Sequence, residues 1–106
     1  MFTEQRKSAR KVLKVRALLA TDSQETMIGR TADVGANGVS VTLPAPLQPG
    51  QACQVSFDVF VDGKLATIKT RSKALYCVLS NGEFKVGFQF LNLDLSAMTV
   101  LARFLR

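Results

Sequence analysis

The chain has 106 residues, which is enough for one compact domain and too few for two, and its 47% hydrophobic and 21% charged residues are typical of a globular protein. It contains no His, which excludes His general acid–base catalysis, Ser-His-Asp and Cys-His nucleophile systems, and most zinc sites. The formal net charge of +6 favours an anionic partner, such as a nucleotide, a nucleic acid or a lipid headgroup. The alternative interpretation is that the positive charge only aids solubility.

Alternating apolar and polar residues predict β-strands along the first part of the chain. Apolar residues at every second position from Leu13 to Leu19 predict the first strand. Two further strands are predicted from Met27 to Val34 and from Val39 to Leu43. The segment from Pro44 to Gly50 holds three prolines and a glycine, so it is predicted to be a loop.

The second half of the sequence predicts two hairpins. A strand from Val55 to Val61 ends at Asp62-Gly63, and a long strand from Lys64 to Ser80 ends at Asn81-Gly82. Both dipeptides favour type I′ turns, because both central positions of that turn need a positive φ. The last strand is predicted from Phe84 to Phe90.

A helix is predicted at the C-terminal end, after Asp94 or Ser96, either of which can cap it. Its apolar stripe has helical spacing and consists of Ala97, Met98, Leu101, Phe104 and Leu105. Short strands with turns at this spacing are typical of an antiparallel sandwich or small barrel. The chain is therefore predicted to be one mainly β domain over residues 1–106, with a basic arm (1–11), an antiparallel sandwich or small β-barrel (12–93) and a C-terminal helix (94–106) that packs on the barrel or on a partner.

The cysteines and the lack of a long apolar run bear on localisation. Cys53 and Cys77 form no CxxC motif, and two cysteines make no disulfide framework, so both are predicted to be reduced, buried thiols. No apolar stretch approaches the ~18 residues of a membrane span, and the basic N-terminus lacks the apolar segment of a secretory signal. We expect a cytoplasmic protein without a membrane span.

Two motifs suggest a binding site. Residues 1–16 carry six basic residues against Glu4 alone, and they include an RxxxR motif at Arg6 and Arg10. A DxGxxG motif runs from Asp33 to Gly38, between two predicted strands. Arginine can bond a phosphate or a guanine edge with two N–H groups, a carboxylate can accept from guanine, and glycines let the backbone approach a flat ring. Taken alone, the first motif is most simply explained as part of a basic segment and the second as a turn. Together, they supply the groups that could bind the base and the phosphate of a guanine nucleotide.

With these motifs in this strand order, the sequence resembles the PilZ domain family from about Arg6 to Leu91. Members are six-stranded antiparallel β-barrels that bind the bacterial second messenger cyclic di-GMP. The RxxxR motif of the family matches Arg6 and Arg10, and its [DN]xSxxG motif matches Asp33 and Gly38, whereas Gly35 replaces the central Ser. Losing one hydroxyl costs about 0.5–1.5 kcal/mol, less than the ~1.5–3 kcal/mol of a charge-assisted arginine contact, so binding is expected to survive.

The resemblance also implies roles for individual residues. Arg6 and Arg10 would hold phosphate and guanine, while Lys7 and Lys11 would add positive charge. Gln5 lies at a flanking position that in this family can influence whether one or two nucleotides bind. Asp33 and the turn after it would hold a guanine edge, and that turn comprises Val34, Gly35, Ala36, Asn37 and Gly38.

The resemblance implies a non-catalytic receptor whose ligand is cyclic di-GMP, with no cofactor, no metal site and no catalytic residue. Ligand binding would order the N-terminal arm and pass the signal to an unidentified partner protein, and the chain would be a monomer or a ligand-linked dimer. One alternative is a ligand-free adaptor of the same family that binds another protein. The other is a small barrel that binds RNA or single-stranded DNA, which the scarcity of excess positive charge outside residues 1–16 disfavours.

Overall fold

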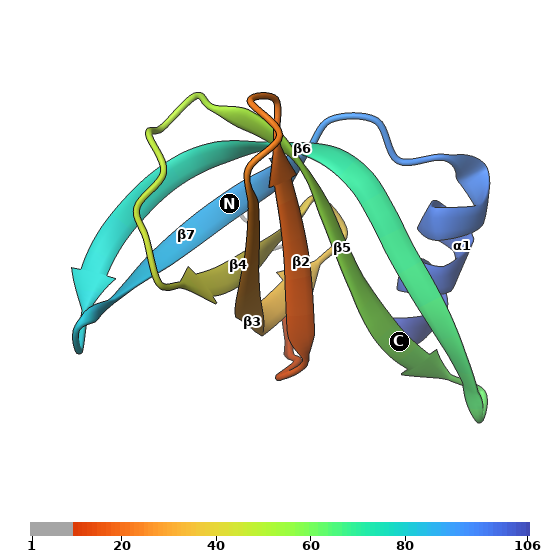
Figure 1. Ribbon diagram of the computed structural model, residues 1–106. Coiled ribbons are helices and arrows are strands. Elements are labelled where there is room, and N and C mark those ends of the chain that lie inside the picture. The colour runs from red at the N-terminus through yellow and green to blue at the C-terminus, as the bar shows by residue number, and fades with distance from the viewer. Residues whose placement is uncertain (1–9) are drawn as a thin grey trace, which may run out of the picture.

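The structure, a computed structural model, describes residues 10–106, and most of them form a closed antiparallel barrel (Figure 1). The barrel strands follow the order β3-β2-β5-β6-β7-β4, and pairing of β3 with β4 closes it. The predicted six-stranded barrel is confirmed, and one extra strand, β1, pairs with β3. The strands are β1 (Arg10–Val12), β2 (Arg16–Thr21), β3 (Thr26–Gly35), β4 (Gly38–Leu43), β5 (Ala52–Val61), β6 (Lys64–Ser80) and β7 (Glu83–Phe90).

The longest strand, β6, pairs with two different neighbours. Its first part, from Lys64 to Lys73, pairs with β5, and its second part, from Ser72 to Ser80, pairs with β7. Figure 1 shows this strand bending over the barrel between the two hairpins. Both predicted turns are confirmed by positive φ at their two central residues, 53° and 76° at Asp62-Gly63 and 53° and 79° at Asn81-Gly82.

The chain between β1 and β2 differs from the predicted continuous strand from Leu13 to Leu19. β1 and β2 both pair antiparallel with β3, but residues 13–15 between them leave the regular ladder. The Thr31 hydroxyl donates to the Leu13 carbonyl and accepts from the Val15 amide at 2.9 Å, and these bonds interrupt the strand. Leu13 and Val15 still pack partly buried against the core, which explains their alternation in the sequence.

The core lies inside the barrel, where alternate side chains of every barrel strand meet. The predicted alternation is confirmed, since apolar side chains of each strand are fully buried. One aliphatic side chain from each of the six strands illustrates this: Leu19, Val34, Val41, Val55, Ile68 and Val86. Two aromatic rings extend the core towards the helix, because Phe57 and Phe90 stack with centroids 6.4 Å apart.

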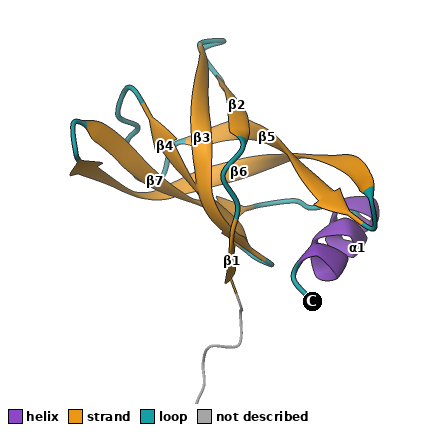
Figure 2. Ribbon diagram, turned by 90° about the horizontal axis from the view of Figure 1, so that it is seen from below, coloured by secondary structure: helices purple, strands orange, loops and turns teal. Residues whose placement is uncertain are grey.

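The C-terminal helix α1 (Leu95–Phe104) begins where predicted, because the Asp94 carboxylate accepts from the Ala97 amide at 2.7 Å. Ala97 and Leu101 are buried against the barrel. Figure 2 shows α1 beside the turn that joins β5 to β6, and Arg103 reaches Asp62 in that turn at 3.4 Å. Met98 of the predicted apolar stripe is 47% exposed, unlike Ala97 and Leu101. Within residues 10–106, no helix has the length and apolar character needed to cross a membrane.

The two cysteines should differ in reactivity. Cys53 is fully buried in β5, whereas Cys77 is only half-buried. Burial raises the pKa of the Cys53 thiol to about 11, against a smaller lowering by Arg71. Because the thiolate is the reactive form, a thiol reagent at about pH 8 should label Cys77 first and Cys53 only slowly. Equal rates in the native protein, measured by mass spectrometry beside an unfolded control, would contradict this.

Candidate functional site

A bulge in β3 turns Asp33 towards the outside of the barrel. The pairing of β3 with β4 shifts register between Thr31 and Asp33, so Ala32 is an extra residue. Without it, alternation from the buried Thr31 would point Asp33 into the core. With it, Val34 is fully buried and the Asp33 side chain remains 31% exposed.

Asp33 is paired with Arg10 of β1. Arg10 lies opposite Gly35, two residues beyond Asp33, so its side chain can reach back to the carboxylate. Its Nε donates to Asp33 Oδ1 at 2.9 Å, and its Nη2 lies 2.7 Å from the same oxygen. An exposed ion pair of this kind contributes only about 0.2–1 kcal/mol, so a ligand can replace or share it at little cost.

A second bulge turns Tyr76 outward in the same way. Side chains are buried at every second position from Ile68 to Ala74, and continuing that pattern would bury Tyr76. The register between β6 and β7 shifts at Leu75, and Tyr76 is 42% exposed, opposite Gly87. A Cβ on Gly87 would overlap the Tyr76 ring, so the missing side chain leaves the space in which the ring lies. Tyr76 therefore offers an aromatic surface supported by the β7 backbone.

Arg10, Asp33 and Tyr76 line one hollow of about 390 Å³. The other lining residues come from β4, β6 and β7 and are Val39, Ser40, Leu75, Lys85, Gly87 and Phe88. The hollow thus combines two cations, one carboxylate, the hydroxyl of Ser40 and the exposed ring of Tyr76 with its own hydroxyl. This set can hold a flat, hydrogen-bonding ring that carries negative charge.

Gly38 of the predicted DxGxxG motif has a structural role here. Gly38 is buried where β4 meets β7, and a Cβ there would overlap the Phe88 carbonyl oxygen. Neither Gly35 nor Gly38 has a positive φ, so neither position needs the conformational freedom of glycine. A glycine is needed at position 38 because the two strands approach each other closely there. Val34 is fully buried, which leaves only its backbone available to a ligand.

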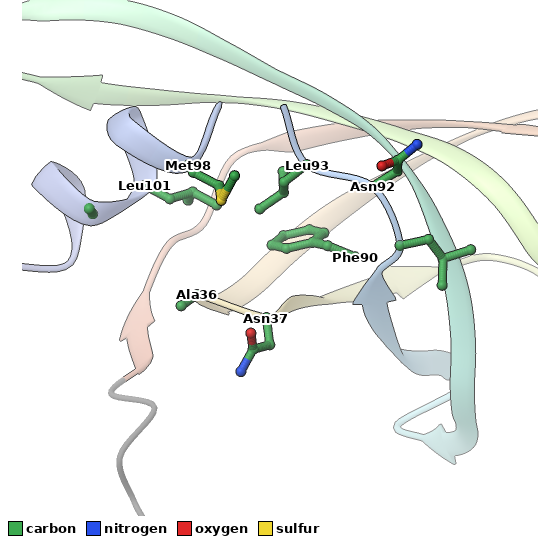
Figure 3. A pocket seen from close by; sticks show the side chains of 9 residues that line it. Ala36, Asn37, Phe90, Asn92, Leu93, Met98 and Leu101 are labelled. Carbon is green, nitrogen blue, oxygen red and sulfur yellow. The ribbon is translucent and has the colours of Figure 1, made fainter. Parts of the chain in front are cut away.

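The exposed tip of the motif opens into a different hollow. Ala36 and Asn37 line a space of about 480 Å³ between the turn and α1. Figure 3 shows Phe90, Leu93, Met98 and Leu101 pointing towards one another there, while the Asn37 amide points away. The Asn37 backbone carbonyl accepts from the Phe90 amide at 2.8 Å, so the turn is tied to β7. Asp33 and the tip of its motif thus lie at two neighbouring hollows.

The other predicted binding residues belong to the N-terminal arm. Gln5, Arg6 and Lys7 lie outside the described residues. Lys11 contacts the helix, because its Nζ lies 5.4 Å from the centre of the Phe104 ring. Of the predicted basic residues, Arg10 is therefore the one that the described part of the chain brings to Asp33.

Three polar residues that line the Arg10–Asp33 hollow were not predicted as site residues from the sequence. Tyr76, Lys85 and Ser40 reach it from β6, β7 and β4. No local motif marks them, since strand pairing over long sequence separations brings them together. The composition shows that the chain has a single tyrosine, but nothing in the sequence places it at this hollow.

Comparison with known proteins gives a family match and several similar structures. The family model described as PilZ domain matches residues 4–106. No curated protein matches the chain.

The similar solved structures share the fold at low sequence identity. The inhibitor of motility (MotI/DgrA) of Bacillus subtilis has a TM-score of 0.83 and 13% identity, over 93% of this chain and 48% of that protein. The PilZ domain with c-di-GMP of YcgR from Escherichia coli has a TM-score of 0.68 and 16% identity, covering 96% and 89% of the two chains. The PlzA protein of Borreliella burgdorferi, in complex with c-di-GMP, has a TM-score of 0.68 and 14% identity, over 97% of this chain and 42% of that protein. This chain thus spans about half the length of the first and third of these proteins.

Proposed function

This chain belongs to the PilZ domain family, and from that premise we propose that it is a receptor for cyclic di-GMP. The observation that carries the proposal is the meeting of Arg10, Asp33 and Tyr76 at one hollow of a PilZ barrel. Two of these three residues are motif residues of the family. Two similar structures, those of the Escherichia coli YcgR PilZ domain and of PlzA, contain this ligand.

The chemistry of the hollow matches the parts of the ligand. Guanine presents an N1–H and an exocyclic amine that can both donate to the Asp33 carboxylate. Arg10 and Lys85 supply the positive charge that a phosphate diester needs. The exposed face of Tyr76 can stack on a purine, an interaction worth about 1–3 kcal/mol for each base.

The proposal extends to the arm and to signalling. Arg6 would add a second arginine to the phosphate or guanine, and Lys7 and Gln5 would lie beside it. The chain would act without catalysis in the cytoplasm. Ligand binding would draw the arm against the barrel and so change the surface of the domain. A partner protein would then bind this changed surface.

Chemical-shift mapping of the isotope-labelled chain tests the site directly. Cyclic di-GMP should shift the backbone amides around Asp33, Tyr76 and Lys85, and cyclic di-AMP should not. The Arg71 amide, on the opposite part of β6, provides an internal reference that should stay in place. Saturable shifts confined to other strands would show that the ligand binds elsewhere and would overturn the assignment.

A further inference from the structure

A second cluster of positive charge lies on the outside of the barrel, at a hollow that Asp33 does not line. Arg16 of β2 and Arg30 of β3 are direct cross-strand partners, and both are exposed. With Lys14 they line one hollow of about 410 Å³. A single acidic residue, Glu83, lines the same hollow, so its lining carries an excess of positive charge.

The pairing of these two arginines is unfavourable in the free protein. Like charges directly opposite each other on neighbouring strands destabilise a sheet. The other two strand arginines in the described part of the chain each contact a carboxylate, Arg10 with Asp33 and Arg71 with Asp22, both at 2.7 Å. Across residues 10–106, neither Arg16 nor Arg30 has a carboxylate within salt-bridge distance, and this includes Glu83. An anion held between them would relieve the repulsion.

We propose that Arg16, Arg30 and Lys14 form a second binding site, specific for a phosphate group. Two neighbouring guanidinium groups can each donate paired N–H bonds to phosphate oxygens. Thr42 lies opposite Arg30 on its other side and lines the same hollow, which adds a hydroxyl. A carboxylate ligand would use fewer of these donors than a phosphate does.

The surface beside the cluster indicates what the phosphate is attached to. Leu18 and Ile28 form the next outward cross-strand pair along β2 and β3, and they are 47% and 58% exposed. Two aliphatic side chains next to three cations suit a phosphate ester that has an apolar part. The source is either a soluble phosphate ester or a phospholipid headgroup, and both present the same group to the arginines.

This site is a neighbour of the proposed cyclic di-GMP site, since its Thr42 is the cross-strand partner of Lys85 in the other hollow, but it uses different residues. The two hollows share no lining residue, since one is lined by Arg10, Asp33 and Tyr76 and the other by Arg16 and Arg30. Each site can therefore be lost without the other. An Arg16→Ala/Arg30→Ala variant should still bind cyclic di-GMP like the unchanged protein.

Titration with inorganic pyrophosphate, followed by NMR at low salt, tests the second site. The Nε–H signals of Arg16 and Arg30 should shift and saturate, and binding should weaken at least ~10-fold in Arg16→Ala/Arg30→Ala. That variant should also unfold at a higher temperature, because the repulsion is gone. A Lys64→Ala/Lys73→Ala variant removes the same charge elsewhere on the chain and should bind like the unchanged protein.

A vesicle-binding experiment distinguishes the two sources of phosphate. Sedimentation with phosphatidylglycerol vesicles, against phosphatidylcholine vesicles, should show arginine-dependent binding if the source is a lipid, and no binding if it is soluble. The proposal is overturned if pyrophosphate leaves both arginine signals unmoved. It is also overturned if the lysine control loses as much affinity for pyrophosphate, because only the overall positive charge of the protein would then matter. Loss of cyclic di-GMP binding in the arginine variant would overturn it too, because the cluster would then be part of the first site.

Discussion

Replacing Arg10 by alanine should weaken cyclic di-GMP binding by about 10- to 150-fold, the equivalent of one charge-assisted contact worth ~1.5–3 kcal/mol. Arg10 is the described arginine that reaches the Asp33 carboxylate, through both Nε and Nη2. The folded state should lose little, because the ion pair is exposed and contributes no more than about 1 kcal/mol. Calorimetric titration together with a thermal unfolding curve separates the two effects.

Lys11→Ala is the matched control for this prediction. It removes the same charge one residue away, but its ammonium group lies against the Phe104 ring of α1. Its effect on the dissociation constant should be much smaller than that of Arg10→Ala. Equal losses in both variants would mean that only the general positive charge of the segment matters, and would contradict the assignment of Arg10 to a direct contact.

Replacing Tyr76 by alanine should weaken binding by about 5- to 150-fold, because stacking on an aromatic ring is worth ~1–3 kcal/mol for each base. The ring lies over Gly87 in the same hollow as Arg10 and Asp33. Tyr76→Phe keeps the ring and loses only the hydroxyl, so it should retain most of the affinity. Titration of the two variants side by side is the measurement.

Gly87→Ala tests the same contact from the other strand. The added methyl group would overlap the Tyr76 ring and must displace it, so binding should fall although Tyr76 itself is unchanged. Unaltered affinity in both Tyr76→Ala and Gly87→Ala would rule out stacking on this ring. In that case the loss in Arg10→Ala would still support a site at Asp33, with the base held differently.

Most strands of the barrel could be predicted because they follow local rules, whereas their closure into a barrel was implied only by the family resemblance. Alternation in β5 and β7 and the positive-φ turns at Asp62-Gly63 and Asn81-Gly82 depend on residues that are neighbours in the sequence. The interruption between β1 and β2 could not be predicted, because it depends on the Thr31 hydroxyl, which is distant in sequence.

The site could be predicted only in part, for the same reason. Arg10 and Asp33 were predicted as site residues from their motifs, and the structure shows them as an ion pair. Tyr76 was missed because simple alternation would bury it, and the bulge at Leu75 that turns it outward has no clear signature in the sequence. Lys85 and Ser40 join the hollow through strand pairing alone.

Calorimetric titration of the unchanged chain with cyclic di-GMP tests the receptor function most directly. We expect saturable binding with a dissociation constant of about micromolar or tighter, equivalent to roughly 8 kcal/mol. Cyclic di-AMP and an Arg6→Ala/Arg10→Ala variant should give no such binding. Absence of heat and of thermal stabilisation at high cyclic di-GMP concentration would contradict the receptor function, and would mean that Gly35 marks a binding site that has lost its activity.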